Sequence, residues 1–435
     1  MAVNNRNLIL FGLVACLYLA TGFLQSWNLS LSILNAALLA TIAALGVNMQ
    51  WGYAGLFSVG TMGFTALGGL AVVLISSRPN AENWQAGGPG ILLALVLGAL
   101  AGMAAVFAWR RLAPGRMRAL IVAAILIGGF FLFRAVFDPN VIAAEAINPE
   151  FAGNLGGLGL PSLIAWPVGG LLAAAAAWGI GKTALGLRSD YLAIATLGIA
   201  EIIVSVLKNE DWLGRGVKNL TDLPRPWPVP YEVELQQQPG FLEFVANWGL
   251  DPVTASTIGV KLLYAGMFGI VLGLVIWLFE RALNSPWGRM MRAIRDNEVS
   301  AAAMGKDVTG RHLQVFILGS AVIGFAGAMM TSMDGQMTPG TYNPLRFTFL
   351  VWVMVIVGGS GNNWGTVLGG LLIGWLWLVV ENVGPSIMGF VTAGLPDGVI
   401  KAHLVASAEH MRLLSMGVIL LLVLRFSPRG LIPEK

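Results

Sequence analysis

Six polar side chains stand inside long apolar stretches of this sequence, where each needs a hydrogen-bonding partner or a role. They are, in chain order, Asn48, Tyr53, Ser58, Thr61, Thr196 and Glu201. Such groups could bind a small polar solute, and a carboxylate in apolar surroundings normally faces a partner or a wet cavity. The alternative is structural: the hydroxyls bond their own helix backbone, and Glu201 is a neutral or hydrogen-bonded structural residue. The spacing alone leaves both interpretations open.

A second group of chemically active residues lies in 285–305, which reads SPWGRMMRAIRDNEVSAAAMG and is the most charge-dense stretch of the chain. Ser285 and Pro286 predict a helix start, with the hydroxyl as the cap and the proline in the first turn. Gly305 predicts the helix end. The prediction is one short helix over 286–304.

This predicted helix is amphipathic. One face carries Met290, Ile294, Asn297 and Ala301, and another carries Arg289, Arg292 and Asp296. A basic surface helix could lie on lipid headgroups. However, the apolar face has only two bulky residues, and so small a face suits a groove in another protein better than a bilayer.

The motifs of common enzymes do not occur in the sequence. The segment WGIGKT at 178–183 imitates the end of a phosphate-binding loop, but Ala176 stands where that loop requires its first glycine. There is no HExxH, no paired-cysteine metal pattern and no nucleophile elbow. We therefore expect no catalytic activity, no bound metal and no cofactor in this chain.

The elements that must position these residues are membrane helices. Of the 435 residues, 56% are hydrophobic and 11% are charged, whereas soluble domains are about 25% charged. Apolar runs near the length of about 20 residues that one bilayer crossing needs recur along the chain. The net charge of +4 is therefore no sign of nucleic-acid binding. The sequence predicts an all-α integral membrane protein surrounded by lipid.

Twelve segments are predicted to cross the membrane. They are 8–26, 33–50, 52–76, 90–109, 119–137, 162–181, 190–208, 258–280, 312–332, 347–358, 366–383 and 411–426. The first is expected to be an uncleaved span rather than a signal peptide. Because 347–358 is short and 33–76 is nearly continuous, either could be re-entrant. The prediction is a helical bundle of about ten to twelve spans.

The basic residues indicate the orientation. They gather in the connections 110–118, 182–188 and 281–311 and at the C-terminus. By contrast, 208–256 has seven acids against four bases, and 138–160 carries acids only. The positive-inside rule places the basic connections in the cytoplasm, and an even number of spans places both termini there. We expect a single membrane domain over 1–435, with an extracytoplasmic loop at 208–256 and a cytoplasmic loop at 281–311.

Five stretches carry a resemblance that covers nearly the whole chain beyond residue 30. They are ALGVNMQWGYAGLFSVG, LRSDYLAIATLGIAEII, SPWGRMMRAIRDNEVSAAAMGKDVTGRHLQVFILGSAVIGFAGAM, GGSGNNWGTVLGG and MRLLSMGVILLLVLRFSPRGLIP. Together they resemble the M-type subunits of the branched-chain amino-acid ABC permeases.

The resemblance implies an importer subunit in a bacterial inner membrane. The implied partners are a second, H-type permease subunit, two cytosolic ATP-binding subunits, a periplasmic binding protein and a small amino-acid substrate. In this family the charge-dense segment docks into a cleft of the ATPase, where ATP hydrolysis would reside. The residues predicted for this coupling are Gly288, Met290, Arg292, Ile294, Arg295, Glu298 and Gly305.

Departures from the family pattern leave the substrate open. Where relatives commonly read GYAGQ-S-GH, this chain has Leu56 and Thr61, so that an amide and an imidazole are lost. The loop GRGVKNLTDLPRPWPVP also differs from the usual Gly-Pro-Asn-Gly pattern, and 77–160 and 222–256 lengthen the chain. Branched-chain amino acids, other amino acids, amides and urea all stay open as substrates.

The alternative function is a secondary transporter or a channel for a small polar solute. Ion coupling would need charged residues inside the membrane, and Glu201 and Glu381 are the candidates. A membrane-embedded enzyme, a third alternative, would need a catalytic constellation that the sequence lacks.

Overall fold

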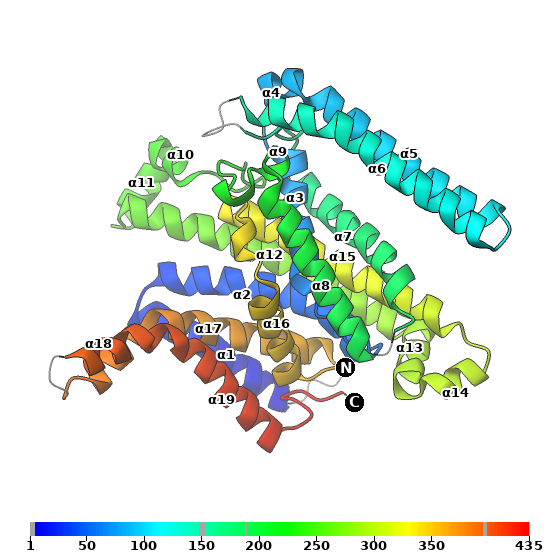
Figure 1. Cartoon of the computed structure of the whole chain (residues 1–435). Helices are drawn as coiled ribbons and strands as arrows, with labels where there is room; N and C mark the ends of the chain where they lie inside the picture. The colour runs from blue at the N-terminus through cyan, green and yellow to red at the C-terminus, as the bar shows by residue number, and fades with distance from the viewer. Residues whose placement is uncertain (1–4, 148–152, 188, 395–397, 435) are drawn as a thin grey trace.

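The computed structural model describes residues 5–147, 153–187, 189–394 and 398–434 (Figure 1). Within these ranges every named element is a helix, and an isolated β-bridge joins Leu220 to Met337. Nine helices of the described part are long and apolar enough to cross a membrane. The predicted all-α, multi-pass membrane fold is confirmed.

All twelve predicted spans coincide with helices. The nine long ones are α1 (Asn5–Leu24), α2 (Trp27–Val47) with its continuation η1 (Asn48–Gly52), α5 (Gly88–Arg111), α6 (Arg116–Glu145), α7 (Ser162–Ala184), α8 (Ser189–Asn209), α12 (Pro252–Leu283), α15 (Val308–Asp334) and α17 (Asn363–Val391). The shorter ones are α3 (Thr61–Ser76), α16 (Pro344–Gly358) and α19 (Met411–Phe426). The start predicted for α3, at residue 52, is wrong, because irregular backbone intervenes before Thr61.

The remaining helices are short and join the spans. They are α4 (Ala81–Ala86), α9 (Asp211–Gly214), η2 (Gly216–Lys218), α10 (Glu232–Gln237), α11 (Pro239–Asn247), α13 (Pro286–Asp296), α14 (Glu298–Ala303), η3 (Pro339–Thr341), α18 (Val399–Ala406) and η4 (Ser407–His410).

Both termini lie at one end of the bundle, which we call the terminal end. Helices α13 and α14 and the turn between α5 and α6 lie at the same end, whereas α10 and α11 lie at the opposite end (Figure 1). This grouping agrees with the predicted common side for the basic connections. Arg188 and Lys435, two of the basic residues in that prediction, lie outside the described residues.

The centre of the bundle is α2, whose membrane-crossing window is 78% buried. It packs against α12, α15 and α17, and α15 in turn packs against α3 and α7. Glycine permits this close packing: a Cβ on Gly68 of α3 would overlap the carbonyl oxygen of Gly324 of α15. Such small-residue contacts are how helices approach closely in lipid. The buried core therefore surrounds the glycine-rich run 45–69.

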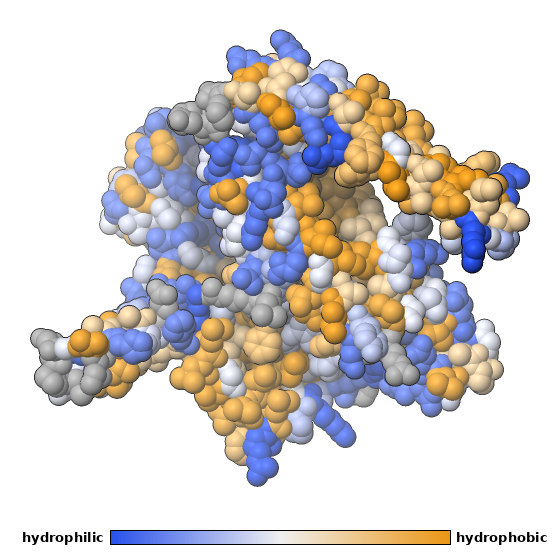
Figure 2. All heavy atoms as spheres, in the orientation of Figure 1, coloured by the Kyte–Doolittle hydropathy of each residue, from blue (hydrophilic) through white to orange (hydrophobic). Residues whose placement is uncertain are grey.

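The hairpin of α5 and α6 is almost separate from this core. Apart from the contact between its own two helices, the hairpin contacts mainly α4 and α9, near the opposite end. None of the membrane-crossing window of α6 is buried. Figure 2 shows the hairpin as an apolar arm that stands away from the bundle. An apolar surface on all sides is typical of a helix pair bathed in lipid.

Candidate functional site

The glycine-rich run 45–69 contains a break in the bundle's central helix. Helix α2 passes into the π-helical turn η1, and irregular backbone follows from Tyr53 to Gly60 before α3 begins. Gly55 adopts φ +73°, a conformation that glycine adopts freely. Single π-helical turns inside helices occur frequently at functional sites. The break is therefore the first part of the candidate site.

Two buried amides fix the first part of this break. The Asn48 Oδ1 accepts a hydrogen bond from the Gly361 amide at 2.9 Å, and its Nδ2 donates to Asn363 Oδ1 at 3.3 Å. The Gln50 Nε2 donates to the Phe316 carbonyl at 3.1 Å and to Ser320 Oγ at 3.0 Å. Because these amides are occupied by the chain itself, the structural interpretation fits Asn48.

Three of the predicted site residues meet where the break touches α8. The Val59 amide donates to Thr196 Oγ1 at 3.0 Å, and the hydroxyl donates to the Ala193 carbonyl at 3.0 Å. Ser58 and Thr61, on either side, are both buried. The Ser58 Oγ has no hydrogen-bond partner among the described residues. Ser58 therefore contributes a buried hydroxyl whose hydrogen-bonding capacity the described part of the chain does not satisfy.

The remaining two predicted residues lie apart from this group. Tyr53 follows η1 directly, and its side chain is only 6% exposed. Glu201 is exposed and shares the outward face of α8 with Gly198 and Ser205. No hydrogen bond or ion pair joins Glu201 to another described residue. The hypothesis of a hydrogen-bonded structural glutamate therefore has no support within this chain.

The charge-dense segment forms two helices, so the predicted single helix over 286–304 is wrong. Asn297 takes an extended conformation, φ −155° and ψ 94°, and its side chain accepts a hydrogen bond from the Ser300 amide to cap α14. The predicted cap is also wrong, because the Ser285 hydroxyl donates to the Ala282 carbonyl at 2.6 Å. The predicted end is confirmed: Gly305 has φ +77°.

The apolar face of α13 packs on its own chain. Ile294 and Met291 are 1% and 0% exposed, and Met290 is half-buried. A Cβ on Gly288 would overlap the backbone of Leu283 at the end of α12. The interpretation that this face enters a groove of another protein is therefore wrong for Ile294. The outward face carries Arg289, Ala293 and Asp296 instead.

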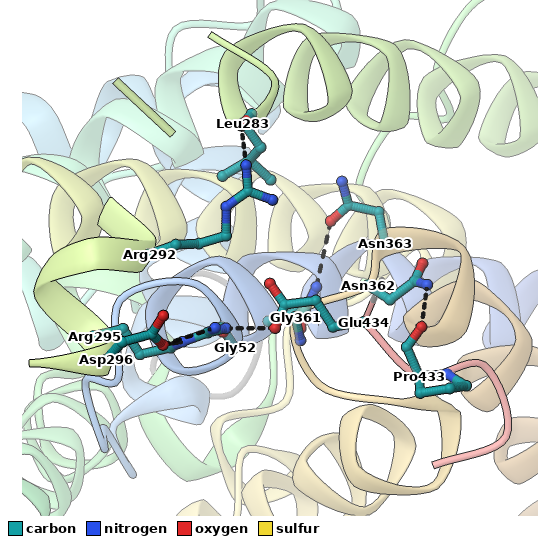
Figure 3. Close-up of polar contacts among 11 residues, drawn as sticks. Gly52, Leu283, Arg292, Arg295, Asp296, Gly361, Asn362, Asn363, Pro433 and Glu434 are labelled. Atoms are coloured by element: carbon teal, nitrogen blue, oxygen red, sulfur yellow. Dashed lines mark hydrogen bonds and ion pairs between the residues drawn. The ribbon is translucent and has the colours of Figure 1, made fainter. Parts of the chain in front are cut away.

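Arg295 ties α13 to the break in α2 (Figure 3). Its Nη1 donates to the Gly52 carbonyl at 2.5 Å and to Glu434 Oε2 at 2.8 Å, and its Nε donates to Asp296 Oδ1 at 3.0 Å. Burial favours a lower pKa for the guanidinium, but hydrogen bonds to Glu434 and Asp296 outweigh it and raise the pKa of Arg295. Arg295 therefore stays charged and holds these partners together.

The other predicted coupling residues surround this contact. The Arg292 Nη2 lies 3.5 Å from the Leu283 carbonyl. Glu298 is exposed, and with Arg295 and His312 it lines a small cavity of about 170 Å³. His312 Nε2 is buried there, and none of the residues that the structure describes forms a hydrogen bond with it. In the described part of the chain, no group of three or more His, Cys, Asp or Glu side chains is placed to hold a metal ion.

Sequence reasoning missed the C-terminal tail. The Leu431 and Ile432 amides donate to the Val357 and Gly358 carbonyls at 2.9 Å each. Next to them, Asn362 Nδ2 donates to the Pro433 carbonyl at 3.1 Å (Figure 3). This pairing brings Glu434 to Arg295. The signal in the sequence was the terminal motif SPRGLIP, which directly follows the last span.

The curated proteins that match this chain are branched-chain amino acid transport permease proteins. The LivM proteins of Salmonella typhimurium and Escherichia coli, each a high-affinity branched-chain amino acid transport system permease protein, are 26% identical over 267 residues. These matches cover 61% of this chain and 56% of each relative, so the match spans just over half of their length. The probable LivM of Methanocaldococcus jannaschii is 27% identical over 374 residues, covering 83% of this chain and 90% of its own.

A shorter match, 31% identical over 120 residues, joins the chain to the probable LivH permease protein of Methanocaldococcus jannaschii. It covers 27% of this chain and 37% of that protein. No solved structure matches the fold. A family model described as the permease component of the branched-chain amino acid transport system matches residues 150–424, well over half of the chain. The chain therefore belongs to the family of branched-chain amino acid transport permease components.

Proposed function

We propose that this chain is the transmembrane subunit of an ATP-driven importer for branched-chain or chemically similar amino acids. The names of its relatives support the substrate class. The observation that carries the coupling is Arg295, which joins α13 at the terminal end to the Gly52 carbonyl in the break of α2. Movement of α13 by a cytosolic ATPase would reach the centre of the bundle through this side chain. The terminal end is then cytoplasmic, in a bacterial inner membrane.

The surface proposed for the ATPase is the outward side of α13 and α14. Arg289, Ala293 and Asp296 recur on one helical face, and Val299 and Met304 beside them are 80% and 78% exposed. A groove of about 880 Å³ adjoins this face, lined by arginines that include Arg289 and Arg429. Apolar side chains beside a polar, basic groove are typical of a protein contact.

The translocation pathway is proposed to run along the outward face of α8. Glu201 and Ser205 lie one helical turn apart on this face, and both are exposed at membrane depth. Polar groups there are unfavourable against lipid and normally face a cavity or another helix. A second permease subunit placed against α8 would enclose them, with Ser58 and Thr196 behind.

A secondary transporter remains the second candidate, because Glu201 is an intramembrane carboxylate that pairs with no other described residue. The other acid considered for ion coupling, Glu381, pairs with Arg412 at 2.6 Å. This leaves Glu201 as the group that a proton or sodium ion would use.

The experiment is uptake of radiolabelled leucine by proteoliposomes. We expect leucine to accumulate when this chain is combined with an H-type permease, two ATPase subunits and a loaded binding protein. ATP is supplied on the side of the membrane that carries the ATPase subunits. Omission of any partner should abolish the accumulation. The control is the chain alone under a proton or sodium gradient. Gradient-driven accumulation by the lone chain would replace the importer proposal with the secondary transporter.

A further inference from the structure

A cavity of about 260 Å³ lies inside the bundle, between α2, α3, α15, α16 and α17. Its lining is mostly aliphatic, aromatic and methionine side chains. Sites for drug-sized ligands typically measure about 300–1,000 Å³, so this cavity suits a smaller molecule, of the size of an amino acid.

Four methionines line the apolar part of this cavity. Met62 comes from α3, Met330 and Met333 come from α15, and Met354 comes from α16. Trp377 of α17 also contributes to the lining. Methionine is unbranched and polarisable, so it can adjust to a branched aliphatic group. The interior therefore fits an aliphatic side chain.

Asp334 is the charged residue in the described lining of this cavity. It is the last residue of α15, it is exposed, and no hydrogen bond or ion pair joins it to another described residue. The C-terminal end of a helix carries partial negative charge, which disfavours a carboxylate there and favours a cation. An unpaired carboxylate in this place attracts a positively charged ligand group.

We propose that this cavity is a subsite for an aliphatic amino acid. The aliphatic side chain lies among the methionines, and the ammonium group pairs with Asp334. No basic side chain contributes to the described lining, so the amine rather than the carboxylate is recognised. The inference takes its substrate class from the proposed function and extends it by naming where in the chain that substrate is held.

The test uses photo-leucine, a leucine analogue whose diazirine inserts into neighbouring groups on illumination. The full chain in lipid nanodiscs is illuminated with the probe, digested and mapped by mass spectrometry. We expect labelling of α15 or α16 at the methionine-lined segments. Leucine and isoamylamine, which carry the ammonium, should compete, whereas 4-methylvalerate, which lacks it, should not. Equal competition by 4-methylvalerate would overturn the assignment to Asp334.

Matched variants separate occupancy from folding. Ala40→Trp fills the cavity and should lower labelling by about tenfold. Ala124→Trp adds the same side chain on an exposed position of α6 and should leave labelling unchanged. Asp334→Asn should lower it by about threefold or more, while Glu243→Gln, an exposed acid of α11, should not. Competition on the unaltered chain needs no variant, so the test holds even where a variant does not fold.

The two proposals fail separately. ATP-driven leucine uptake by the full complex, without any labelling of the cavity, would overturn the subsite and leave the importer standing. Cavity labelling that obeys the competition pattern, without ATP-driven uptake, would support the subsite and overturn the importer. Labelling that is equal in Ala40→Trp and the unaltered chain would also overturn the subsite.

Discussion

Arg295 joins parts of the chain that are far apart in sequence: α13, the break after α2, and the C-terminal tail. A guanidinium has five N–H donors in a fixed plane, so one side chain can hold a carbonyl and two carboxylates together. Lysine offers a compact point charge instead and cannot keep the same arrangement. This contact is where the proposed signal from the ATPase enters the membrane domain.

At the scale of single residues, we expect Arg295→Gln to abolish most substrate-stimulated ATPase activity of the complex, and Arg295→Lys to keep an intermediate part of it. A double-mutant cycle with Glu434→Gln should give a coupling of about 0.5–3 kcal/mol in the free energy of unfolding. The matched control is Arg116→Gln, which removes an exposed arginine at the start of α6, outside the proposed ATPase surface. Equal loss in the control would mean that positive charge at the terminal end, and not the Gly52 contact, matters.

Glu201 gives the second prediction at this scale. Its side chain has no partner within the described chain, so Glu201→Gln and Glu201→Leu should both keep the thermal stability of the isolated subunit. In the assembled complex we expect Glu201→Leu to lose more leucine uptake than Glu201→Gln, because leucine leaves polar partners unpaired at about 1–3 kcal/mol. Full uptake by both variants at equal expression would show that this carboxylate faces lipid as a bystander.

At the scale of elements, α13 has two faces with different tasks. Met291 and Ile294 pack against the rest of the chain, whereas Arg289, Ala293 and Asp296 are exposed on the opposite face. Because Asn297 is extended, α14 turns away as a separate helix and presents Val299 and Met304. Substitutions on the two faces should therefore differ in what they change.

We expect Ile294→Ala to lower the free energy of unfolding by about 2–5 kcal/mol, as for other buried large-to-small changes. Val299→Asp should leave stability within about 0.5 kcal/mol, because its side chain is exposed, but should weaken binding of the ATPase subunits. Thermal unfolding of the subunit and co-purification of the ATPases measure the two effects. Normal co-purification of Val299→Asp would exclude α14 from the ATPase contact.

At the scale of the whole molecule, the α5–α6 hairpin is an addition to the bundle rather than a part of its core. A small cluster of Ile91, Ala144 and Leu155 attaches it near the opposite end, together with a hydrogen bond of 2.9 Å from the Trp212 amide to Glu145 Oε1. Its ends are adjacent, since a Cβ on Gly87 would lie 3.0 Å from Ala144 Cβ. The hairpin can therefore be removed without stretching the chain.

We expect a chain in which a short Gly-Ser linker replaces 88–145 to unfold within about 2–4 °C of the complete chain in the same nanodiscs. The bundle keeps α2, α3, α7 and α15 packed against one another, and the hairpin contributes little to that core. A control with the linker inserted between Arg111 and Arg116 keeps the hairpin. A much larger drop for the deletion alone would mean that the hairpin supports the bundle.

Much of this arrangement could be predicted from the sequence. Apolar runs of membrane-crossing length indicated all twelve helices, because length and hydropathy are local properties. Gly305 marked the end of the charge-dense segment for the same reason. The interruption between α13 and α14 at Asn297 was not predicted. An Asn that caps a second helix and an Asn inside one continuous helix leave a similar periodicity of apolar residues around them. The late start of α3, at Thr61 instead of residue 52, was likewise hidden in apolar sequence.

The sequence by itself determined the membrane class, the helical elements and the family motifs, since composition and local pattern carry that information. Only the tertiary structure decided which polar groups are occupied and which are free. It paired Asn48 with Asn363, left Ser58 Oγ and Glu201 without partners among the described residues, and brought Glu434 to Arg295. It also turned Ile294 inward and enclosed a cavity beside Asp334. These relations join residues that are distant in the chain, and helix periodicity fixes a face without fixing what that face meets.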